Sequence, residues 1–274
     1  MKKNWFITGT SRGFGKILAL ELLKQGCRVM GTTRDGMTDI VDKNFSVFKL
    51  DVTNEIQVKF ALQAAKEWLG TIDVIVNNAG FGIVGALEEV SDDEARHVFD
   101  TNVFGTLNVL RGALPILRAQ KSGHIVNFSS VGGFAGSAGF GIYNATKFAV
   151  EGLSEALFQE VKPFNVGVTI VEPGGFRTDF LTNHSLVRAE SIIDDYTETS
   201  GKMRQYADER NGLQPSDPVA GMKLLIKAIN EENPTLRLPL GQDCINRMSI
   251  KLQSVTEEVS RWSFYTKDVE FRSD

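Results

Sequence analysis

Tyr143 and Lys147 are the two residues of this sequence whose types and spacing most directly suggest acid–base chemistry. They stand four positions apart at the start of an expected helix, so their side chains lie on one helix face. A free tyrosine has a pKa near ~10 and is a poor base at neutral pH. A neighbouring ammonium stabilises the phenolate, and we therefore expect Lys147 to lower the pKa of Tyr143 toward the working range.

Such a pair is common by chance, so it needs support from other polar residues. Ser129 and Ser130 end an expected strand, His124–Phe128, at the sheet edge where α/β proteins place their sites. The Ser130 hydroxyl is expected to hold a substrate oxygen beside Tyr143. Asn102 falls inside an expected helix, where asparagine is disfavoured and often faces solvent. Its apolar neighbours nevertheless make a buried position plausible.

A glycine-rich turn follows the first expected strand, Trp5–Thr8. Gly9, Gly13 and Gly15 have the spacing G-x-x-x-G-x-G, and a helix is expected from Gly15 to Gln25. Glycines allow a tight turn and close approach of a pyrophosphate to the helix N-terminus. The alternative is a simple glycine-rich turn. The expected dinucleotide contacts of this turn are Gly9, Ser11, Arg12, Gly13, Phe14 and Gly15.

The end of the second expected strand favours NADP(H) over NAD(H). An NAD site usually places an acid there for the ribose hydroxyls, but this strand ends in Thr33 and Arg34, with no acid before Asp35. A 2′-phosphate would be attracted by Arg34, joined by Arg12 from the glycine turn, through charge-assisted hydrogen bonds. Each arginine taken alone could equally be a solvated surface charge.

Short apolar runs alternate with helix-period segments along the chain. The runs are nearly continuous in apolar residues, which is typical of strands buried on both faces of a parallel sheet. We predict one domain over residues 1–274, an α/β doubly wound (Rossmann), mostly parallel seven-stranded sheet with helices on both faces. From about 174 to 215 no strand is expected, and this segment is interpreted as a substrate lid. A helical extension, about 241–274, is expected to pack on the body. The expected strands are Trp5–Thr8, Arg28–Thr32, Ser46–Leu50, Asp73–Val76, His124–Phe128, Val166–Val171 and Thr235–Leu238.

Composition narrows the function classes. The formal net charge is -4, which argues against a nucleic-acid partner. His97, His124 and His184 lack metal-ligand spacing, so no metal site is expected. Cys27 and Cys244 are expected to be reduced packing residues. No signal peptide and no run near the ~20 apolar residues of a membrane span is found, so we expect a cytoplasmic protein without a membrane partner.

Together these motifs resemble the short-chain dehydrogenase/reductase family, in its single-domain branch, over roughly residues 4 to 240. The tail beyond Gly241 loosely resembles extensions of a carbonyl-reductase and hydroxysteroid-dehydrogenase-like subgroup. The matching positions, in family order, are Thr8, Gly9, Gly13, Gly15, Asp51, Val52, Asn77, Asn78, Ala79, Gly80, Asn102, Ser130, Tyr143, Lys147, Pro173, Gly174 and Thr178.

The resemblance implies that Tyr143 is the general acid/base, Ser130 positions the substrate oxygen, and Lys147 binds the nicotinamide ribose. Asn102 would hold a water in a proton relay to Lys147. The implied reaction is NADP(H)-dependent interconversion of a ketone or aldehyde and an alcohol, on a small-molecule substrate. The alternative is a non-catalytic NADP(H)-binding sensor, and a homodimer or homotetramer is the implied assembly. The remaining cofactor contacts would be Thr33, Arg34, Asp51, Val52, Asn78, Ala79, Gly80, Pro173, Gly174, Phe176 and Thr178.

Overall fold

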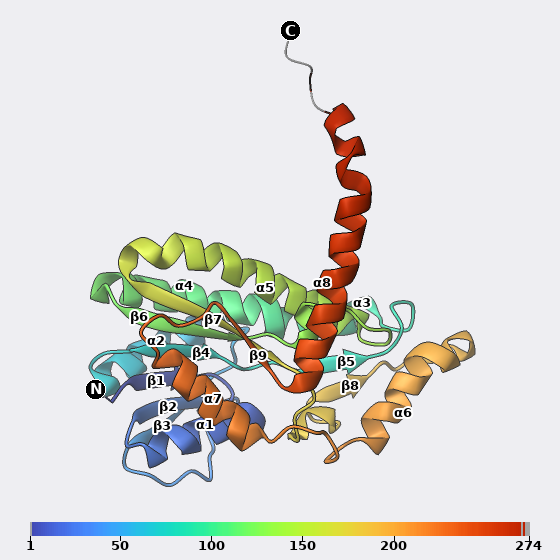
Figure 1. The fold of residues 1–274 in the computed structure, drawn as a ribbon. Coiled ribbons are helices and arrows are strands. Elements are labelled where there is room, and N and C mark those ends of the chain that lie inside the picture. The colour runs from blue at the N-terminus through green and yellow to red at the C-terminus, as the bar shows by residue number, and fades with distance from the viewer. Residues whose placement is uncertain (1, 270, 272–274) are drawn as a thin grey trace.

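A seven-stranded sheet with all strands parallel forms the centre of the protein (Figure 1). The computed structural model describes residues 2–269 and 271. The strand order is β3-β2-β1-β4-β6-β7-β9, so the chain reverses direction across the sheet between β1 and β4. The predicted doubly wound fold is therefore confirmed. The strands are β1 (Asn4–Ile7), β2 (Arg28–Thr33), β3 (Phe45–Lys49), β4 (Val74–Asn77), β6 (Gly123–Phe128), β7 (Val166–Pro173) and β9 (Arg237–Leu240).

Helices cover both faces of the sheet because each strand sends apolar side chains to both sides. On one face α1 and α7 pack together, with Leu22 and Leu225 in a shared core. On the other face α2, α4 and α5 pack through residues such as Leu62 and Leu117. The helices are α1 (Gly13–Lys24), α2 (Glu55–Leu69), α3 (Asp92–Phe99), α4 (Gly105–Gln120), α5 (Gly141–Val161), α6 (Lys202–Glu209), α7 (Pro218–Ile229) and α8 (Gln242–Ser263).

The long helix expected after Ser91 begins as predicted but is not uniform. Ser91 and Glu94 form a capping box at the start of α3. The helix then widens into a π-helical turn, Asp100–Phe104, before it continues as α4. A π-helical turn inside an α-helix frequently marks a functional site. This turn contains Asn102, which explains how an asparagine is accommodated in the middle of the helix.

A second sheet was missed by the sequence analysis. β5 (Gly82–Val84) pairs in parallel with β8 (Leu186–Arg188), which lies inside the segment expected to have no strand. Both strands have three residues, too few to give a periodic pattern. The pairing fixes the 174–215 segment beside the carboxyl edge of the main sheet, where it also contains α6. The prediction that this segment lacks strands is therefore wrong.

The C-terminal extension is helical, but the expected packing on the body holds only at its base. Cys244 in the first turn of α8 is fully buried, whereas Leu252 and Val259 are 54% and 62% exposed. The second half of α8 projects away from the body (Figure 1). Residues 270 and 272–274 of the predicted extension lie outside the described residues.

Candidate active site

Tyr143 lies in the first turn of α5 and is buried between two aromatic rings. Its ring centroid is 6.1 Å from that of Phe140 and 5.5 Å from that of Phe180. Burial raises the pKa of Tyr143 to about 12, opposed in part by a hydrogen bond with Ser130. The expected net fall of this pKa toward the working range is not found in the protein chain by itself, because desolvation of the phenolate dominates. The phenol is therefore held in its protonated, donating form.

Lys147 follows one helical turn later, and its ammonium points to the end of β6. Its Nζ donates a hydrogen bond of 2.8 Å to the carbonyl of Phe128 and lies 5.8 Å from the ring centroid of Tyr143. Burial lowers the pKa of Lys147 to about 8, and the carboxylate of Glu151 opposes this shift. The ammonium consequently changes its protonation near physiological pH.

Ser130 is positioned by the turn that follows β6. Its Oγ accepts a hydrogen bond of 3.1 Å from the backbone N–H of Gly132, which opens the short turn Val131–Gly133. A Cβ on Gly132 would lie 2.5 Å from the side-chain oxygen of Asn144, so any larger residue there would displace the Asn144 amide. The turn therefore fixes the Ser130 hydroxyl within hydrogen-bonding reach of Tyr143.

Asn102 is buried at 1% exposure, and its side chain joins two other parts of the site. Its Oδ1 accepts from the N–H of Phe81 at 3.0 Å, and its Nδ2 donates to the carbonyl of Phe81 at 2.8 Å. The same Nδ2 donates to Thr146 Oγ1 at 3.1 Å. A Cβ on Gly80 would come within 2.8 Å of Asn102 Oδ1. Asn102 thus holds the segment after β4 against α5, as its predicted burial implied.

The glycine turn after β1 is tied to the end of β4. Asn78 Nδ2 donates to the carbonyls of Thr8 and Gly9, at 2.9 Å each. Gly9 and Gly13 have positive φ values of 73° and 56°, which favour glycine. A Cβ on Gly15 would lie 2.2 Å from the carbonyl oxygen of Gly9, so the helix starts against the turn. The turn sits at the switch point between β1 and β4, where α/β sheets bind ligands.

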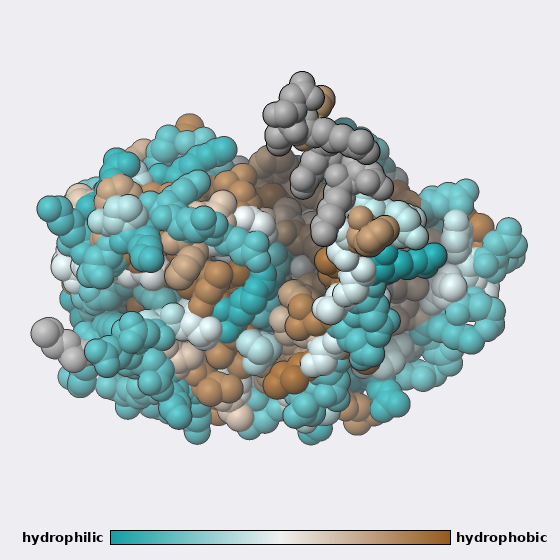
Figure 2. All heavy atoms as spheres, turned by 45° about the horizontal axis from the view of Figure 1, so that its top comes forward, coloured by the Kyte–Doolittle hydropathy of each residue, from teal (hydrophilic) through white to brown (hydrophobic). Residues whose placement is uncertain are grey.

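A surface depression opens beside this turn and extends to the 174–215 segment. Figure 2 shows hydrophobic side chains in the middle of the face that it draws and mostly hydrophilic side chains on its flanks. The depression beside the glycine turn is lined by polar and charged residues together with Ile17 and Leu20. Its lining residues are Ser11, Arg12, Gly13, Lys16, Ile17, Leu20, Arg177, Thr178, Asp179, Asn211 and Gly212.

The two arginines expected at the 2′-phosphate have different surroundings. Arg12 donates from Nε to Ser185 Oγ at 3.0 Å and from Nη2 to the carbonyl of His184 at 2.7 Å. Its guanidinium is therefore engaged by the 174–215 segment. Arg34 is exposed at the end of β2. Of the two, only Arg34 lies where the second strand ends.

The acid nearest to Arg34 is occupied by its own turn. Asp35 Oδ1 accepts hydrogen bonds from Thr33 Oγ1 at 3.1 Å and from the N–H of Met37 at 2.9 Å. The Met37 N–H is the largest cause that lowers the pKa of Asp35. The carboxylate thus folds back on residues 33–37. Its two hydrogen bonds hold the Thr33–Arg34 end of the strand in shape.

The remaining expected cofactor residues lie along the carboxyl edge. Asp51 accepts from the N–H and hydroxyl of Thr53, and Asn108 Nδ2 donates to the carbonyl of Val52 at 3.0 Å. Ala79 N–H donates to Thr8 Oγ1 at 3.0 Å, which places it beside the glycine turn. These contacts hold the loops after β3 and β4 in fixed positions.

After β7, the chain passes from Pro173 into the 174–215 segment. Gly174 N–H donates to the carbonyl of Leu240 at 2.9 Å, and Thr178 Oγ1 accepts from Phe180 N–H at 3.3 Å. Phe176 is buried in the core, 5.2 Å from Phe14 between ring centroids. The structure therefore places Phe176 beneath the glycine turn as packing, while Gly174 and Thr178 lie at the edge.

Glu89 is a residue that sequence reasoning missed. Its fully buried carboxylate accepts from Arg204 Nη1 at 2.6 Å, from Ser200 Oγ at 3.0 Å, and from the N–H groups of Ala86 and Ile193. The Arg204 hydrogen bond is the main cause that lowers the pKa of Glu89 to about 2. This ion pair anchors α6 to the loop after β5. No local pattern identifies it, because Ile193, Ser200 and Arg204 are more than 100 positions away in sequence.

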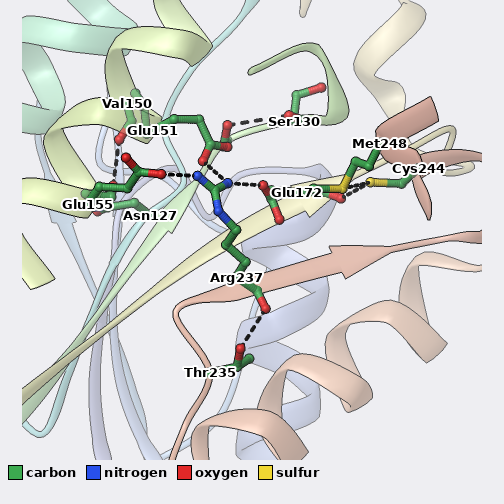
Figure 3. Close-up of polar contacts among 12 residues, drawn as sticks. Asn127, Ser130, Val150, Glu151, Glu155, Glu172, Thr235, Arg237, Cys244 and Met248 are labelled. Atoms are coloured by element: carbon green, nitrogen blue, oxygen red, sulfur yellow. Dashed lines mark hydrogen bonds and ion pairs between the residues drawn. The ribbon is translucent and has the colours of Figure 1, made fainter. Parts of the chain in front are cut away.

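A second missed cluster of charged side chains surrounds Arg237 (Figure 3). Arg237 Nη1 donates to Glu151 at 2.6 Å and to Glu172 at 2.5 Å, and its Nη2 also contacts Glu155. Burial raises the pKa of Glu172 to about 7, with a further contribution from the nearby Glu151 charge. An acid inside the apolar strand Val166–Pro173 was the available sequence signal, since such a buried charge needs a partner.

The described residues contain no group of His, Cys, Asp and Glu side chains that could bind a metal ion. In that same part of the chain, no helix combines the length and apolar character needed to span a membrane.

Comparison with known proteins agrees with this geometry. The family model of the short chain dehydrogenases matches residues 3–188. A 3-ketodihydrosphingosine reductase of Bacteroides thetaiotaomicron is 40% identical over 86% of both chains. A crystal structure of a short-chain dehydrogenase from Streptomyces avermitilis, 36% identical, superposes with a TM-score of 0.91 and covers 99% of this chain and 100% of its own. ElxO with NADP bound is 28% identical, with a TM-score of 0.70, and covers 87% of this chain and 97% of its own.

The chain belongs to the short-chain dehydrogenase/reductase family, as the sequence resemblance predicted. It is an oxidoreductase of that family, built on a single Rossmann-like domain.

Proposed function

We propose that the protein is an NADP(H)-dependent oxidoreductase that interconverts a ketone or aldehyde and an alcohol, with Tyr143 as the general acid/base. The observation that carries the proposal is the buried phenol of Tyr143, with the Ser130 hydroxyl beside it and Lys147 Nζ 5.8 Å from its ring centroid. A protonated phenol beside a fixed hydroxyl is a suitable donor for a carbonyl oxygen. A non-catalytic sensor would not need this arrangement.

The residues at the switch point fit a dinucleotide. Gly13 has open space where a Cβ would stand, and its turn leads directly into α1, so backbone N–H groups and the helix dipole face a pyrophosphate. Gly80 carries no side chain, so it leaves room for a bound cofactor beside Asn102 and Lys147. NADP(H), when bound, supplies or accepts the hydride. ElxO, a relative with NADP bound, supports the same class of cofactor here.

The choice of NADP(H) rests on the end of β2. Arg34 is exposed there, whereas the Asp35 carboxylate is turned back onto Thr33 and Met37. A guanidinium without a competing carboxylate favours a 2′-phosphate over ribose hydroxyls. Arg12 could join it only by leaving Ser185 and His184.

Three side chains have separate proposed roles at the substrate carbonyl. Ser130 holds the substrate oxygen by a hydrogen bond, and Tyr143 transfers its phenolic proton to that oxygen as charge develops on it. Lys147 stabilises the resulting phenolate, since its ammonium lies within 5.8 Å of the tyrosine ring centroid. We infer that the 174–215 segment covers the substrate, with Phe180 against Tyr143 forming an apolar wall.

Consumption of NADPH and of NADH, followed at 340 nm with a panel of ketones, aldehydes and long-chain 3-keto compounds, tests the proposal. The 3-keto group is included because the Bacteroides relative is named for such a substrate. We expect NADPH oxidation with at least one carbonyl, abolished in Tyr143→Phe while NADPH binding remains. Activity retained by Tyr143→Phe would remove the tyrosine from its role, and NADPH binding without turnover of any substrate would favour a sensor.

A further inference from the structure

Helix α8 carries a seven-residue repeat on the part that projects from the body. Apolar residues recur at alternating intervals of three and four over three heptads, which is the pattern of a two-stranded coiled coil. Except for Met248, which contacts Cys244 at the base, the members of this stripe are 38–62% exposed. They are Ile245, Met248, Leu252, Val255, Val259 and Trp262.

The stripe is regular in a way that burial on the body does not explain. The side of α8 that meets the body runs through Cys244 and Arg247, whose guanidinium donates to the carbonyl of Ala135 at 2.7 Å. These two residues lie beside the stripe rather than on it. A strict heptad stripe packs against a second helix in a coiled coil. The projecting part of α8 has no such second helix beside it among the described residues.

Charges beside the stripe identify the partner and its direction. Lys251 and Glu258 precede Leu252 and Val259, so they occupy equivalent flanking positions in successive heptads. In an antiparallel pair of identical helices these equivalent positions face each other. Lys251 of one chain then meets Glu258 of the other, and the two-fold axis repeats the pair.

The same register pairs the apolar residues without a gap. Leu252 of each chain faces Val255 of the other at the centre, Met248 faces Val259, and Ile245 faces Trp262. A parallel pair would instead place Lys251 against Thr256, and Glu258 against Ser263, with no charge complement. Antiparallel pairing also puts the two bodies at opposite ends of the helix pair.

A membrane surface is a poorer fit for this helix. Amphipathic helices that lie on bilayers are usually rich in Lys and Arg on their polar face. Helix α8 has three basic residues, Arg247, Lys251 and Arg261, balanced by three acidic ones, Asp243, Glu257 and Glu258. Its charge pattern is matched to a copy of itself.

We propose that α8 joins two copies of this chain through an antiparallel coiled coil, with Lys251 paired to Glu258 of the other copy. The interface is independent of the catalytic residues and of the cofactor choice. It is also separate from the helices containing Asn102 and Tyr143.

Sedimentation velocity of the full-length protein tests the interface. Leu252→Asp places a charge at the centre of the stripe, and we expect it to halve the number of chains in the assembly. The matched control is Ile250→Asp, because Ile250 is 70% exposed on the same helix but lies off the stripe. An assembly of unchanged size in Leu252→Asp would overturn the proposal, as would loss of assembly in both variants.

Charge reversal tests the register. Glu258→Lys and Lys251→Glu each put like charges together in the antiparallel pair, so either alone should weaken association by about tenfold or more, and the double variant should restore it. Equal behaviour of the single and double variants would overturn the antiparallel arrangement. Binding of a monomeric wild-type chain to phosphatidylglycerol vesicles, lost in Leu252→Asp, would replace the second copy with a membrane. Circular dichroism of each variant checks that α8 remains helical.

Discussion

The ammonium of Lys147 donates a 2.8 Å hydrogen bond to the carbonyl oxygen of Phe128, the last residue of strand β6. This bond connects the helix that carries Tyr143 to the strand that leads into Ser129 and Ser130. The hydrogen bond to Phe128 therefore fixes the position of the Lys147 ammonium. Its burial makes that charge sensitive to pH near neutrality.

Lys147→Ala is expected to reduce kcat/KM for carbonyl reduction on the order of 100-fold, because the phenolate of Tyr143 loses its stabilising charge. Burial lowers the pKa of Lys147 to about 8, so the ammonium is present below that pH and lost above it. The wild-type kcat/KM should accordingly fall as pH rises through about 8. In Lys147→Arg this decline should move to higher pH, because arginine stays protonated. A decline at the same pH in both proteins would assign it to another group.

Arg34→Asp is expected to raise the KM for NADPH by about 10- to 100-fold and to change the KM for NADH little. A charge-assisted hydrogen bond to a phosphate is lost and a repulsive carboxylate replaces it. Steady-state kinetics with both cofactors measure the effect. Lys43→Asp, an exposed charge reversal on the loop before β3, is the control. Equal losses for NADPH and NADH in Arg34→Asp would contradict the 2′-phosphate assignment.

Glu89→Gln is expected to cost about 3 kcal/mol of folding stability at neutral pH, since it leaves the Arg204 guanidinium without its buried partner. The lowered pKa of Glu89, about 2 in the folded chain, means that its contribution is complete above pH 4.5 and is lost as pH falls toward 2. Urea unfolding of wild type and variant should therefore differ at pH 7 and converge in acid.

The same variant should loosen the 174–215 segment. Limited trypsin digestion should cut Glu89→Gln faster than wild type at Lys202, whereas Asp92→Asn, an exposed acid of α3, should leave the rate unchanged. Identical digestion of Glu89→Gln and wild type would show that this ion pair does not anchor the segment.

Glu172→Gln is expected to flatten the pH dependence of stability between about pH 4.5 and 7. Burial raises the pKa of Glu172 to about 7, so the folded chain retains a proton that the unfolded chain releases above pH 4.5. Wild-type stability should consequently decline across this window and remain lower above it. The amide of the Glu172→Gln variant does not titrate in this range, so the decline should be absent. Glu155→Gln, at an exposed member of the same cluster, should keep the wild-type slope.

Much of the sheet could be predicted because its strands are buried on both faces. The run of apolar residues from Val166 to Val171, for example, identifies β7 without any knowledge of its neighbours. The candidate site residues could be proposed in the same way, since Tyr143 and Lys147 share one helix and Ser130 follows one strand by two positions. Spacing along the chain is sufficient to predict that two residues lie together when they are close in sequence.

The features that could not be predicted depend on contacts between residues far apart in sequence. β5 and β8 are three-residue strands about 100 positions apart, and each is stabilised mainly by the other. Glu89 and Arg204 meet only in the folded chain. Arg12 could not be placed for the same reason, because Ser185, which accepts its hydrogen bond, lies 173 positions away. The pKa of Tyr143 depended on burial, which spacing to Lys147 does not report.

The two ends of the 174–215 segment lie side by side. Ser216 N–H donates to the carbonyl of Gly175 at 3.1 Å, and Arg177 N–H donates to the carbonyl of Ser216 at 3.0 Å. The chain therefore leaves the sheet and returns to it at one point. The points where the segment begins and ends are therefore set by β7 and α7, while β8 and Arg204 hold its interior to the body. If the segment covers the substrate as we propose, a graft that keeps Gly175, Arg177 and Ser216 would change substrate preference without moving Tyr143.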